Sequence, residues 1–487
     1  MTTHTDRVAL PDVPTRLLIG GEWRDASDAK TFAVEDPATG EPIARVADGT
    51  PQDAVAALDA ACAAQQAWAA TAPRERSEIL RRSYEAVVAQ ADALALVMTL
   101  EMGKPRAESR AEVLYAADFL RWFAEEAVRI EGRVAPAPNG GSRLLTFRQP
   151  VGPCYAITPW NFPMAMGTRK LGPALAAGCT IVIKPAQQTP LSMLALARIL
   201  EQAGVPAGVV NVLTATSSGA VSRPIIDDPR LRKLTFTGST AVGKLLVEQS
   251  AKNLLRTSME LGGNAPFLVF ADADLDAAVE GAVIAKMRNI GEACTAANRF
   301  HVEASVAEEF AVRLARRLAA MKVGHGADEG VAVGPLIDAT QRDKVAGLVD
   351  DALGRGARAL TGGARVDGPG YFYAPTVLDR VPQGAELLRE EIFGPVAPIV
   401  AFASEDEAVA AANDTEYGLV AYLYTQDLKR AFRVSERLET GMIGLNQGMV
   451  SNAAAPFGGV KQSGFGREGG HEGIDEYVEV KYIAMAT

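Results

Sequence analysis

One cysteine of this sequence lies where nucleophilic chemistry is conceivable. Cys294 is in the stretch GEACTAANRF, and it is one of only four cysteines in 487 residues. A thiolate can attack a carbonyl carbon and form a covalent intermediate. A free cysteine is more often a small buried apolar side chain. Apolar residues before it recur at a helical spacing, which favours the second interpretation: Val279, Val283, Met287 and Ile290. The residues alone leave both interpretations open.

Two glycine-rich stretches match phosphate-binding patterns. The first, GSTAVGK from Gly238 to Lys244, follows an apolar strand pattern and opens a helical pattern at 241–252. Leu245 follows it where a P-loop needs a hydroxyl for magnesium, so nucleotide hydrolysis is not expected. A glycine turn that favours a pyrophosphate and an ordinary strand-to-helix turn both remain possible. The second, Gly464, Gly466 and Gly469 in SGFGREGG, has no apolar strand before it, and we expect a flexible loop there.

The elements around these stretches alternate between short apolar runs and longer helical patterns, which is typical of parallel sheets with crossover helices. The first series predicts strands at 180–186, 208–214 and 231–238 and a helix at 191–204. The second series predicts strands at 299–304, 397–403, 421–426 and 441–446 and a helix at 305–321. Alanine-rich helices are expected at 53–70 and 92–103, packed on the first series. We therefore predict an α/β protein with a nucleotide-binding domain followed by a second α/β domain.

The segment 132–152 contains Asn139-Gly140 between extended stretches, which indicates a hairpin. The final stretch, 474–487, alternates like a strand. A terminal strand with an open edge often pairs with another subunit.

Composition excludes several classes of function. The net charge of −10 argues against general nucleic-acid binding, and no apolar run approaches the roughly 20 residues that cross a bilayer. The four cysteines and four histidines are dispersed, so neither a disulfide framework nor a metal site is expected. A reducing cytoplasm is the expected location.

A set of motifs occurs in the order seen in aldehyde dehydrogenases, and the chain resembles that family from residue 20 to its C-terminus. The motifs are PWNFP (159–163), IKPAQQTP (183–190), FTGS (236–239), ELGGNAP (260–266), GEACTAANR (291–299) and EEIFGPV (390–396). The stretches MAMGTRKLGPALAAGC, MRNIGEACTAANR and APFGGVKQSGFGREGG are most similar to the succinate-semialdehyde dehydrogenase branch and its glutarate-semialdehyde relatives.

The resemblance implies a domain division and an assembly. It implies a Rossmann-type dinucleotide-binding domain at 1–125 and 146–258 and a catalytic domain at 259–445. An oligomerisation element is implied at 126–145 and 472–487, with a substrate and cofactor loop at 446–471. A homodimer or homotetramer follows from the same likeness.

The resemblance also implies the catalytic roles. Cys294 becomes the nucleophile that forms a thiohemiacetal and then a thioester. Asn161 becomes the donor to the oxyanion, although Asn161 followed by Pro163 would also suit a helix N-cap. Glu260 becomes the base that activates water, although a glutamate at a strand end is ordinarily a solvated charge. We expect the neighbouring Glu292 to face away from the thiol, because a carboxylate there would hinder thiolate formation.

The implied cofactor contacts are Trp160, Lys184, Gln187, Gly238, Ser239, Gly243, Glu391 and Phe393. Many NAD-preferring relatives have glutamate at position 187, where it repels a 2′-phosphate. The neutral Gln187 therefore predicts that NADP or NAD is used, with a leaning to NADP.

Arg169, Arg288 and Ser451 match residues that hold the far carboxylate of succinate semialdehyde. The expected function is NAD(P)-dependent oxidation of that aldehyde, or of a similar ω-carboxylated one, to the dicarboxylic acid. Three alternatives remain: a glutarate-semialdehyde or broader aldehyde dehydrogenase, a coenzyme A-acylating enzyme, and a binding protein without turnover, as in the crystallins that resemble this family.

Overall fold

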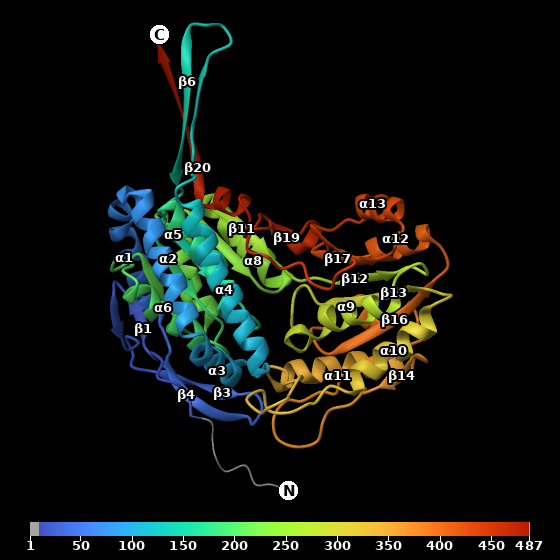
Figure 1. Cartoon of the computed structure of the whole chain (residues 1–487). Helices are drawn as coiled ribbons and strands as arrows, with labels where there is room; N and C mark the ends of the chain where they lie inside the picture. Colours follow the sequence, from blue (N-terminus) through green and yellow to red (C-terminus); the bar gives the residue numbers. More distant parts are fainter. Residues whose placement is uncertain (1–8, 487) are drawn as a thin grey trace.

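The two series of alternating strands and helices form two separate sheets with helices packed against them (Figure 1). The computed structural model describes residues 9–486. The first sheet has the strand order β19-β11-β10-β7-β8-β9-β1-β2. Its strands are β1 (Leu17–Ile19), β2 (Glu22–Arg24), β7 (Cys154–Ile157), β8 (Ile181–Lys184), β9 (Val210–Val212), β10 (Lys233–Thr237), β11 (Arg256–Glu260) and β19 (Gly464–Phe465). The helices of this part are α1 (Pro51–Ala70), α2 (Pro73–Ala89), α3 (Ala91–Met102), α4 (Arg106–Glu126), α5 (Ala165–Ala177), α6 (Leu191–Gln202), α7 (Ser218–Asp227) and α8 (Thr240–Ser250).

The centre of the first sheet is parallel. Strand β7 pairs in parallel with β8 and β10, and β10 also pairs in parallel with β11, with Thr237 opposite Glu260. The expected strands at 180–186, 208–214 and 231–238 and the helix at 191–204 are confirmed as β8, β9, β10 and α6. The carboxyl ends of parallel strands meet at one edge, where ligands bind in open α/β sheets. Ile157, Lys184, Thr237 and Glu260 all lie at that edge.

The second sheet has the strand order β14-β15-β16-β13-β12-β17-β18. Its strands are β12 (Ala265–Val269), β13 (Ala297–Glu303), β14 (Arg358–Thr361), β15 (Thr376–Asp379), β16 (Val396–Phe402), β17 (Val420–Tyr424) and β18 (Met442–Leu445). Its helices are α9 (Leu275–Met287), α10 (Ala307–Ala319), α11 (Ala339–Gly354), α12 (Glu405–Asn413) and α13 (Leu428–Arg437). The predicted second α/β series is confirmed. A separate pair of strands, β3 (Thr31–Asp36) and β4 (Glu41–Ala47), packs near α3.

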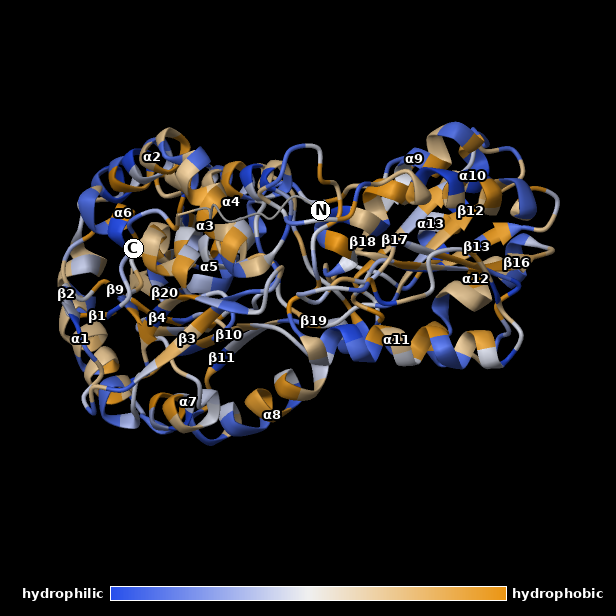
Figure 2. Ribbon diagram, turned by 90° about the horizontal axis from the view of Figure 1, so that it is seen from below, coloured by the Kyte–Doolittle hydropathy of each residue, from blue (hydrophilic) through white to orange (hydrophobic). Residues whose placement is uncertain are grey.

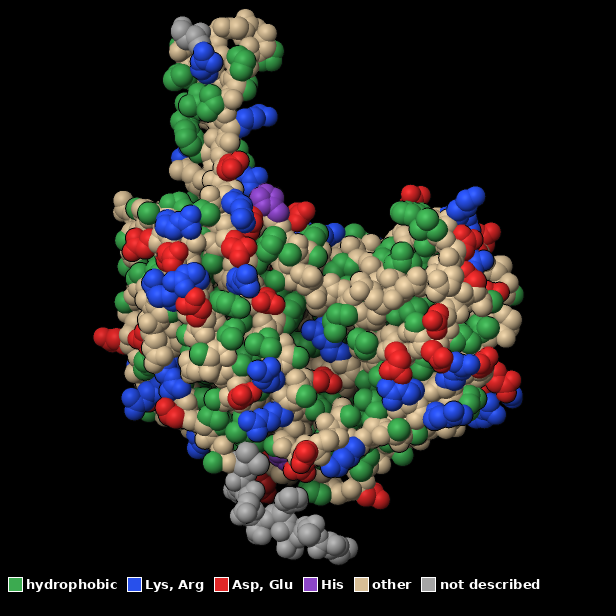
Figure 3. Space-filling view, in the orientation of Figure 1, with side chains coloured by type: hydrophobic (Ala, Val, Ile, Leu, Met, Phe, Trp, Pro, Cys, Tyr) green, Lys and Arg blue, Asp and Glu red, His purple; other side chains and the backbone are tan. Residues whose placement is uncertain are grey.

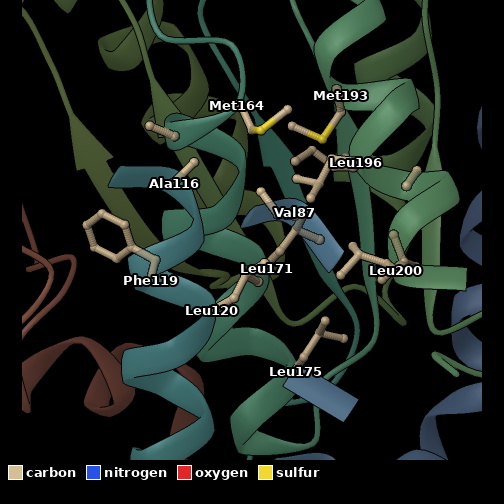
Figure 4. Packing of buried hydrophobic residues seen from close by; sticks show 14 of the residues in the cluster. Val87, Ala116, Phe119, Leu120, Met164, Leu171, Leu175, Met193, Leu196 and Leu200 are labelled. Carbon is tan, nitrogen blue, oxygen red and sulfur yellow. The ribbon is translucent and has the colours of Figure 1, made fainter. Parts of the chain in front are cut away.

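The helices turn apolar faces toward the interior. Helix α11 alternates polar and apolar turns in Figure 2, and its Val345 and Val349 are fully buried. Figure 4 shows side chains of α4 and α5, among them Phe119, Leu120 and Leu171, packed together in the core of the first part. Within residues 9–486, no helix combines the length and apolar character needed to cross a membrane.

Helices α1 and α3 confirm the two helices expected at 53–70 and 92–103. Helix α4 was not predicted, although it spans 21 residues. It begins directly after Pro105, and no side chain caps its first turn. Its buried face, which includes Val113, Phe119 and Phe123, packs most extensively against α2 and α5. This helix lies behind the candidate site described below.

A three-stranded arm projects from the first part (Figures 1 and 3). It consists of β5 (Arg133–Pro136), β6 (Ser142–Pro150) and β20 (Val478–Ala486), and β20 runs antiparallel to β6 over its whole length. The hairpin and the terminal strand are therefore confirmed. Strand β6 crosses residue 146, where the sequence-based division placed a domain limit. That division remains a prediction.

The stretch SGFGREGG is not simply a flexible loop, and that expectation was wrong. Gly464 and Phe465 form β19, which pairs with β11 so that Gly464 lies opposite Glu260. A Cβ atom on Gly464 would lie 1.9 Å from the carbonyl oxygen of Met259, so only glycine permits this approach. The stretch is part of the first sheet and lies beside the candidate site.

Candidate active site

Segments far apart in the sequence meet around a cavity of about 210 Å³ between the two sheets. The expected site residues that line it are Trp160, Asn161, Gly238, Ser239, Glu260, Cys294, Glu391 and Phe393. The expected residues that lie outside its lining are Lys184, Gln187, Gly243, Arg169, Arg288 and Ser451. A larger hollow of about 880 Å³, lined by Arg299 and His301 among others, contains none of the expected site residues.

Cys294 follows a turn that the backbone makes in an unusual conformation. Asn289 and Ile290 have φ values of 52° and 60°, in the left-handed region that side chains disfavour. At Gly291, a Cβ atom would lie 2.2 Å from the carbonyl oxygen of Gly394. The turn brings Cys294 to the cavity, where burial raises the pKa of its thiol to about 12, opposed by the nearby Arg169 guanidinium. The thiol is therefore protonated at neutral pH and needs a base to become a nucleophile.

Asn161 points its amide toward the turn that precedes the cysteine. Its Nδ2 atom donates a hydrogen bond of 2.9 Å to the backbone oxygen of Glu292. Asn161 does not cap the following helix, because α5 begins at Ala165 and Met164 is its N-cap residue. The carboxylate of Glu112 accepts from the backbone N–H groups of Met164 and Ala165 instead. The alternative role of Asn161 as a helix cap is thereby removed.

Glu260 is the last residue of β11 and is only 4% exposed. Burial raises the pKa of its carboxyl group well above the usual range, and the nearby Glu468 adds to this effect. Among the described residues, its Oε2 atom has no hydrogen-bond partner. A buried carboxyl group with a raised pKa can hold or accept a proton near neutral pH, as a general base requires.

Sequence reasoning gave no role to Glu468, which the structure places beside Glu260. Its carboxylate forms ion pairs with the Nε atom of Arg169 at 2.6 Å and the Nζ atom of Lys170 at 2.5 Å. Lys170 also donates to Thr237 Oγ1 at 2.7 Å. A signal was present in the sequence, because two adjacent cations inside an otherwise apolar helical stretch require a buried counter-charge.

The glycine turn lies at the start of a helix. Ser239 is the N-cap residue of α8, and its hydroxyl accepts from the backbone N–H of Val242. This end of the helix, with Gly238, opens into the cavity and suits an anionic group. Gly243 serves packing, because a Cβ atom there would lie 2.4 Å from the side chain of Leu261.

The remaining expected cofactor residues fall into two groups. Trp160 and Phe393 contact each other edge to face, with ring centres 5.3 Å apart, and Glu391 accepts from the backbone N–H of Gly263. Burial raises the pKa of Glu391 to about 7. Lys184, whose pKa burial lowers to about 8, and the exposed Gln187 lie beyond the cavity. Gln341 and Lys344 also line the cavity, and sequence reasoning missed both.

The two expected carboxylate-binding arginines differ in their surroundings. Arg288 donates from Nη1 to Ser451 Oγ at 2.9 Å, and its guanidinium carbon lies 4.8 Å from the ring centre of Phe162. Arg169 is 1% exposed, paired with Glu468 and stacked 3.8 Å above the ring of Phe457. The structure therefore brings Arg288 and Ser451 together, while the charge of Arg169 already has a partner.

Glu292 is fully buried and turns its side chain away from the cavity. Its Oε1 atom accepts from the backbone N–H of Ile337 at 3.1 Å. Burial raises the pKa of this carboxyl group well above the usual range. The expectation that Glu292 faces elsewhere is confirmed.

Comparison with known proteins is consistent with this geometry. The profile of the aldehyde dehydrogenase family matches residues 23–483. The chain belongs to the aldehyde dehydrogenase family. A succinate-semialdehyde dehydrogenase of Paenarthrobacter nicotinovorans is 59% identical over 444 residues, which are 91% of this chain and 99% of that protein. The succinate-semialdehyde dehydrogenase [NADP(+)] of Escherichia coli K12 is 50% identical over 96% of this chain and 97% of its own length.

Among solved structures, a succinate-semialdehyde dehydrogenase from Burkholderia pseudomallei superimposes on this aldehyde dehydrogenase with a TM-score of 0.97 and 50% identity, covering 99% of this chain and 100% of the other. The resemblance inferred from the motifs and the fold that it implied are both confirmed.

Proposed function

We propose that this aldehyde dehydrogenase oxidises succinate semialdehyde, or a similar ω-carboxylated aldehyde, to the dicarboxylic acid with NADP or NAD. The observation that supports it most is the meeting of Cys294, Asn161 and Glu260 at one cavity, with Arg288 and Ser451 hydrogen-bonded to each other nearby. A nucleophile, an oxyanion donor and a base are the groups that aldehyde oxidation through a thioester requires.

The first step is attack of the Cys294 sulfur on the aldehyde carbon. The thiol gives up its proton, and Glu260 is the neighbouring group whose raised pKa suits it to accept. The carbonyl oxygen then carries negative charge, which the Asn161 amide and the backbone N–H of Cys294 stabilise. NADP or NAD, when bound, would supply the hydride acceptor that this adduct requires.

The second step is hydrolysis of the thioester on Cys294. Glu260 first releases the thiol proton to solvent and returns to its carboxylate form. It then takes a proton from water, and the resulting hydroxide attacks the acyl carbon. The sulfur leaves as a thiolate, and the acid is released. Transfer to coenzyme A would need no such base, so the position of Glu260 favours hydrolysis over the acylating alternative.

The residues fit a dinucleotide. Gly238 and Ser239 begin α8 where backbone N–H groups can receive a pyrophosphate, and Glu391 offers a carboxylate to a ribose. Gln187 brings no negative charge against a 2′-phosphate. The relative from Escherichia coli is named for NADP, which agrees with the leaning to NADP.

The far carboxylate of the substrate is assigned mainly to Arg288 with Ser451. Arg169 contributes less than the sequence suggested, because Glu468 already neutralises it. A four-carbon and a five-carbon semialdehyde differ by one methylene, worth only about 1–3 kcal/mol of discrimination, so glutarate semialdehyde remains the second substrate candidate.

The arm is assigned to subunit pairing in a homodimer or homotetramer in the cytoplasm. Its apolar side chains are exposed in the single chain: Val134, Phe147, Val480, Tyr482, Ile483 and Met485. Figure 3 shows hydrophobic side chains along the projecting arm. Isolated apolar surface on a two-sided ribbon is stabilised when another subunit covers it.

The test compares succinate semialdehyde with butanal, an uncharged aldehyde of the same chain length, by the absorbance of the reduced cofactor. We expect the wild type to prefer the semialdehyde in kcat/KM. Arg288→Gln should remove about 1.5–3 kcal/mol of that preference, which is about 10- to 100-fold, and leave butanal oxidation almost unchanged. Equal loss on both aldehydes would contradict the carboxylate assignment. No reduction of cofactor with any aldehyde would favour the binding-protein alternative.

A further inference from the structure

Helix α4 extends two acidic side chains toward the two segments that form the candidate site. Glu108 and Glu112 are four residues apart and therefore lie on the same face of the helix. Neither lines the cavity, and no step of the proposed chemistry uses them. Their contacts nevertheless reach the segment of Asn161 and the segment of Arg288.

Glu112 holds the segment that contains Asn161. Its Oε1 atom accepts from the backbone N–H of Met164 at 3.1 Å and of Ala165 at 3.2 Å, which caps α5 from outside. Its other oxygen pairs with the ammonium group of Lys104. Lys104 is fully buried and donates to the backbone oxygen of Asn161 at 2.8 Å. One ion pair therefore fixes both ends of the segment from Asn161 to Ala165.

Lys104 also contacts the aromatic ring that follows Asn161. Its Nζ atom lies 4.2 Å from the ring centre of Phe162, and the guanidinium carbon of Arg288 lies 4.8 Å from the same ring centre. The Phe162 ring therefore has both the buried ammonium group and the expected carboxylate-binding arginine as neighbours.

Glu108 holds the turn that contains Asn289. Its Oε2 atom accepts from the backbone N–H of Asn289 at 2.5 Å. The side-chain Nδ2 of Asn289 donates to the backbone oxygens of Asn161 at 2.8 Å and Glu292 at 2.9 Å. Asn289 has the left-handed conformation noted above, which costs free energy and persists only where neighbours fix it.

These contacts form one connected set. Glu292 accepts through its backbone oxygen from both Asn161 and Asn289, and Asn161 accepts through its own backbone oxygen from both Lys104 and Asn289. Helix α4 itself is fixed by its packing on α5 (Figure 4). Two side chains on one helix therefore connect the two segments that contain Asn161 and Asn289.

We propose that Lys104, Glu108 and Glu112 are positioning residues of this enzyme. Lys104 with Glu112 sets the direction of the Asn161 amide and so acts on the rate of aldehyde oxidation whatever the substrate. Glu108 sets the turn that follows Arg288 and precedes Cys294, so its loss should lower the rate with every aldehyde and lower the affinity for carboxylated aldehydes only. The second half rests on the proposed function, and the first half needs only an oxidisable aldehyde.

The first experiment uses the double variant Lys104→Met/Glu112→Gln. Removing both charges avoids a buried ion without a partner, which would destabilise the fold. The glutamine can still accept from the start of α5, while the donor to Asn161 is lost. We expect single-turnover reduction of the cofactor to slow by about 10- to 100-fold with succinate semialdehyde and with butanal alike, since a misplacement of about 1 Å has effects of that size.

The second experiment compares Glu108→Ala with Glu108→Gln. The alanine variant should raise KM for succinate semialdehyde by about tenfold, in keeping with the loss of one hydrogen bond to a charged group, and leave KM for butanal unchanged. Glu108→Gln retains an acceptor oxygen and should restore most of the affinity. A residue that served only stability would not separate the two aldehydes.

The matched control is Glu125→Gln, an exposed acidic residue on the same helix, which should leave every rate and KM at the wild-type value. Thermal unfolding and cofactor affinity verify that each variant is folded. A folded double variant with wild-type single-turnover rates, or a Glu108→Ala variant in which KM changes equally for both aldehydes, would overturn the proposal. If the wild type oxidises both aldehydes equally well, the proposed substrate fails, while the double variant still tests the positioning of Asn161.

Discussion

Two buried glutamates near the cavity have opposite properties. Burial raises the pKa of Glu260 well above its usual range, and no partner stabilises its Oε2 atom within residues 9–486. Burial would raise the pKa of Glu468 too, but Lys170 and Arg169 hold it below its usual range. The cavity wall thus contains a carboxyl group that can exchange a proton, and the layer behind it contains one that stays ionised.

The difference shows how one protein assigns different tasks to the same side chain. A group that reacts is left without a partner, so that its charge state can change near neutral pH. A group that positions its neighbours is paired on both oxygens, as Glu468 and Glu112 are. This contrast can be tested by changing Glu260, the unpaired glutamate that lines the cavity, and Glu468, the paired glutamate behind it.

The largest effect is expected for Glu260→Gln, which removes the base and keeps the shape. Hydrolysis of the thioester should slow by about 10³-fold. One equivalent of reduced cofactor should still form ahead of hydrolysis, but in a slower burst than in the wild type, because the Cys294 thiol must then lose its proton directly to solvent. In the wild type, kcat should rise as pH rises through the raised pKa of Glu260, because only the carboxylate activates water. Rapid-mixing absorbance measures the burst, and a steady-state pH profile measures the rise. A variant with full turnover would exclude Glu260 as the base.

A second effect is expected for Glu468→Gln, which leaves Arg169 and Lys170 without a buried counter-charge. The free energy of unfolding should fall by about 3–5 kcal/mol. Because the folded-state pKa of Glu468 is lowered, its contribution to stability is present above the unfolded-state pKa and is lost as pH falls through the folded-state pKa. Denaturant titration between neutral and acid pH measures both. An unchanged denaturation midpoint at neutral pH would show that the pairing of Glu468 with Arg169 and Lys170 does not stabilise the fold.

The Glu468→Gln variant also tests whether the charge of Glu468 acts on the pKa of Glu260. Removal of the neighbouring negative charge should lower the pKa of Glu260, so the rise of kcat should move to lower pH. No shift in a folded variant would show that the two carboxylates do not interact.

The smallest effect is expected for Gln187→Glu. A carboxylate there should weaken NADP by about 1–2 kcal/mol, or about 5- to 30-fold, and change NAD little, because only NADP has a 2′-phosphate to be repelled. Titration of each cofactor by fluorescence measures this change. If the variant binds NADP and NAD with the same affinities as the wild type, Gln187 has no role in cofactor choice.

The residues that line the cavity were easier to predict from the sequence than the buried charged residues behind them. The parallel strands β8, β9 and β10 were predictable because each is a short apolar run between turn signals. The segments around Cys294, Asn161 and Glu260 were recognisable because each contains its own motif. These features are local in the sequence, so no knowledge of distant contacts was needed.

The arrangement of the buried charged residues behind the cavity depends on contacts between residues that are far apart in the sequence. In the sequence, Lys104 and Glu112 resemble ordinary surface charges, and α4 contains too many charged residues for its apolar face to be evident. The strand β19 has two residues and exists only because β11 lies beside it. The pairing of Glu468 with residues 169 and 170 spans about 300 positions, and no spacing rule predicts it.

The proposed mechanism requires that Cys294 becomes acylated. Mass spectrometry of the Glu260→Gln enzyme, quenched during reaction with succinate semialdehyde and cofactor, should show a succinyl group on the peptide that contains Cys294. The Cys294→Ala variant should show no such mass and should produce acid at least about 10⁴-fold more slowly than the wild type. An unmodified Cys294 peptide, together with normal acid production by Cys294→Ala, would contradict the account.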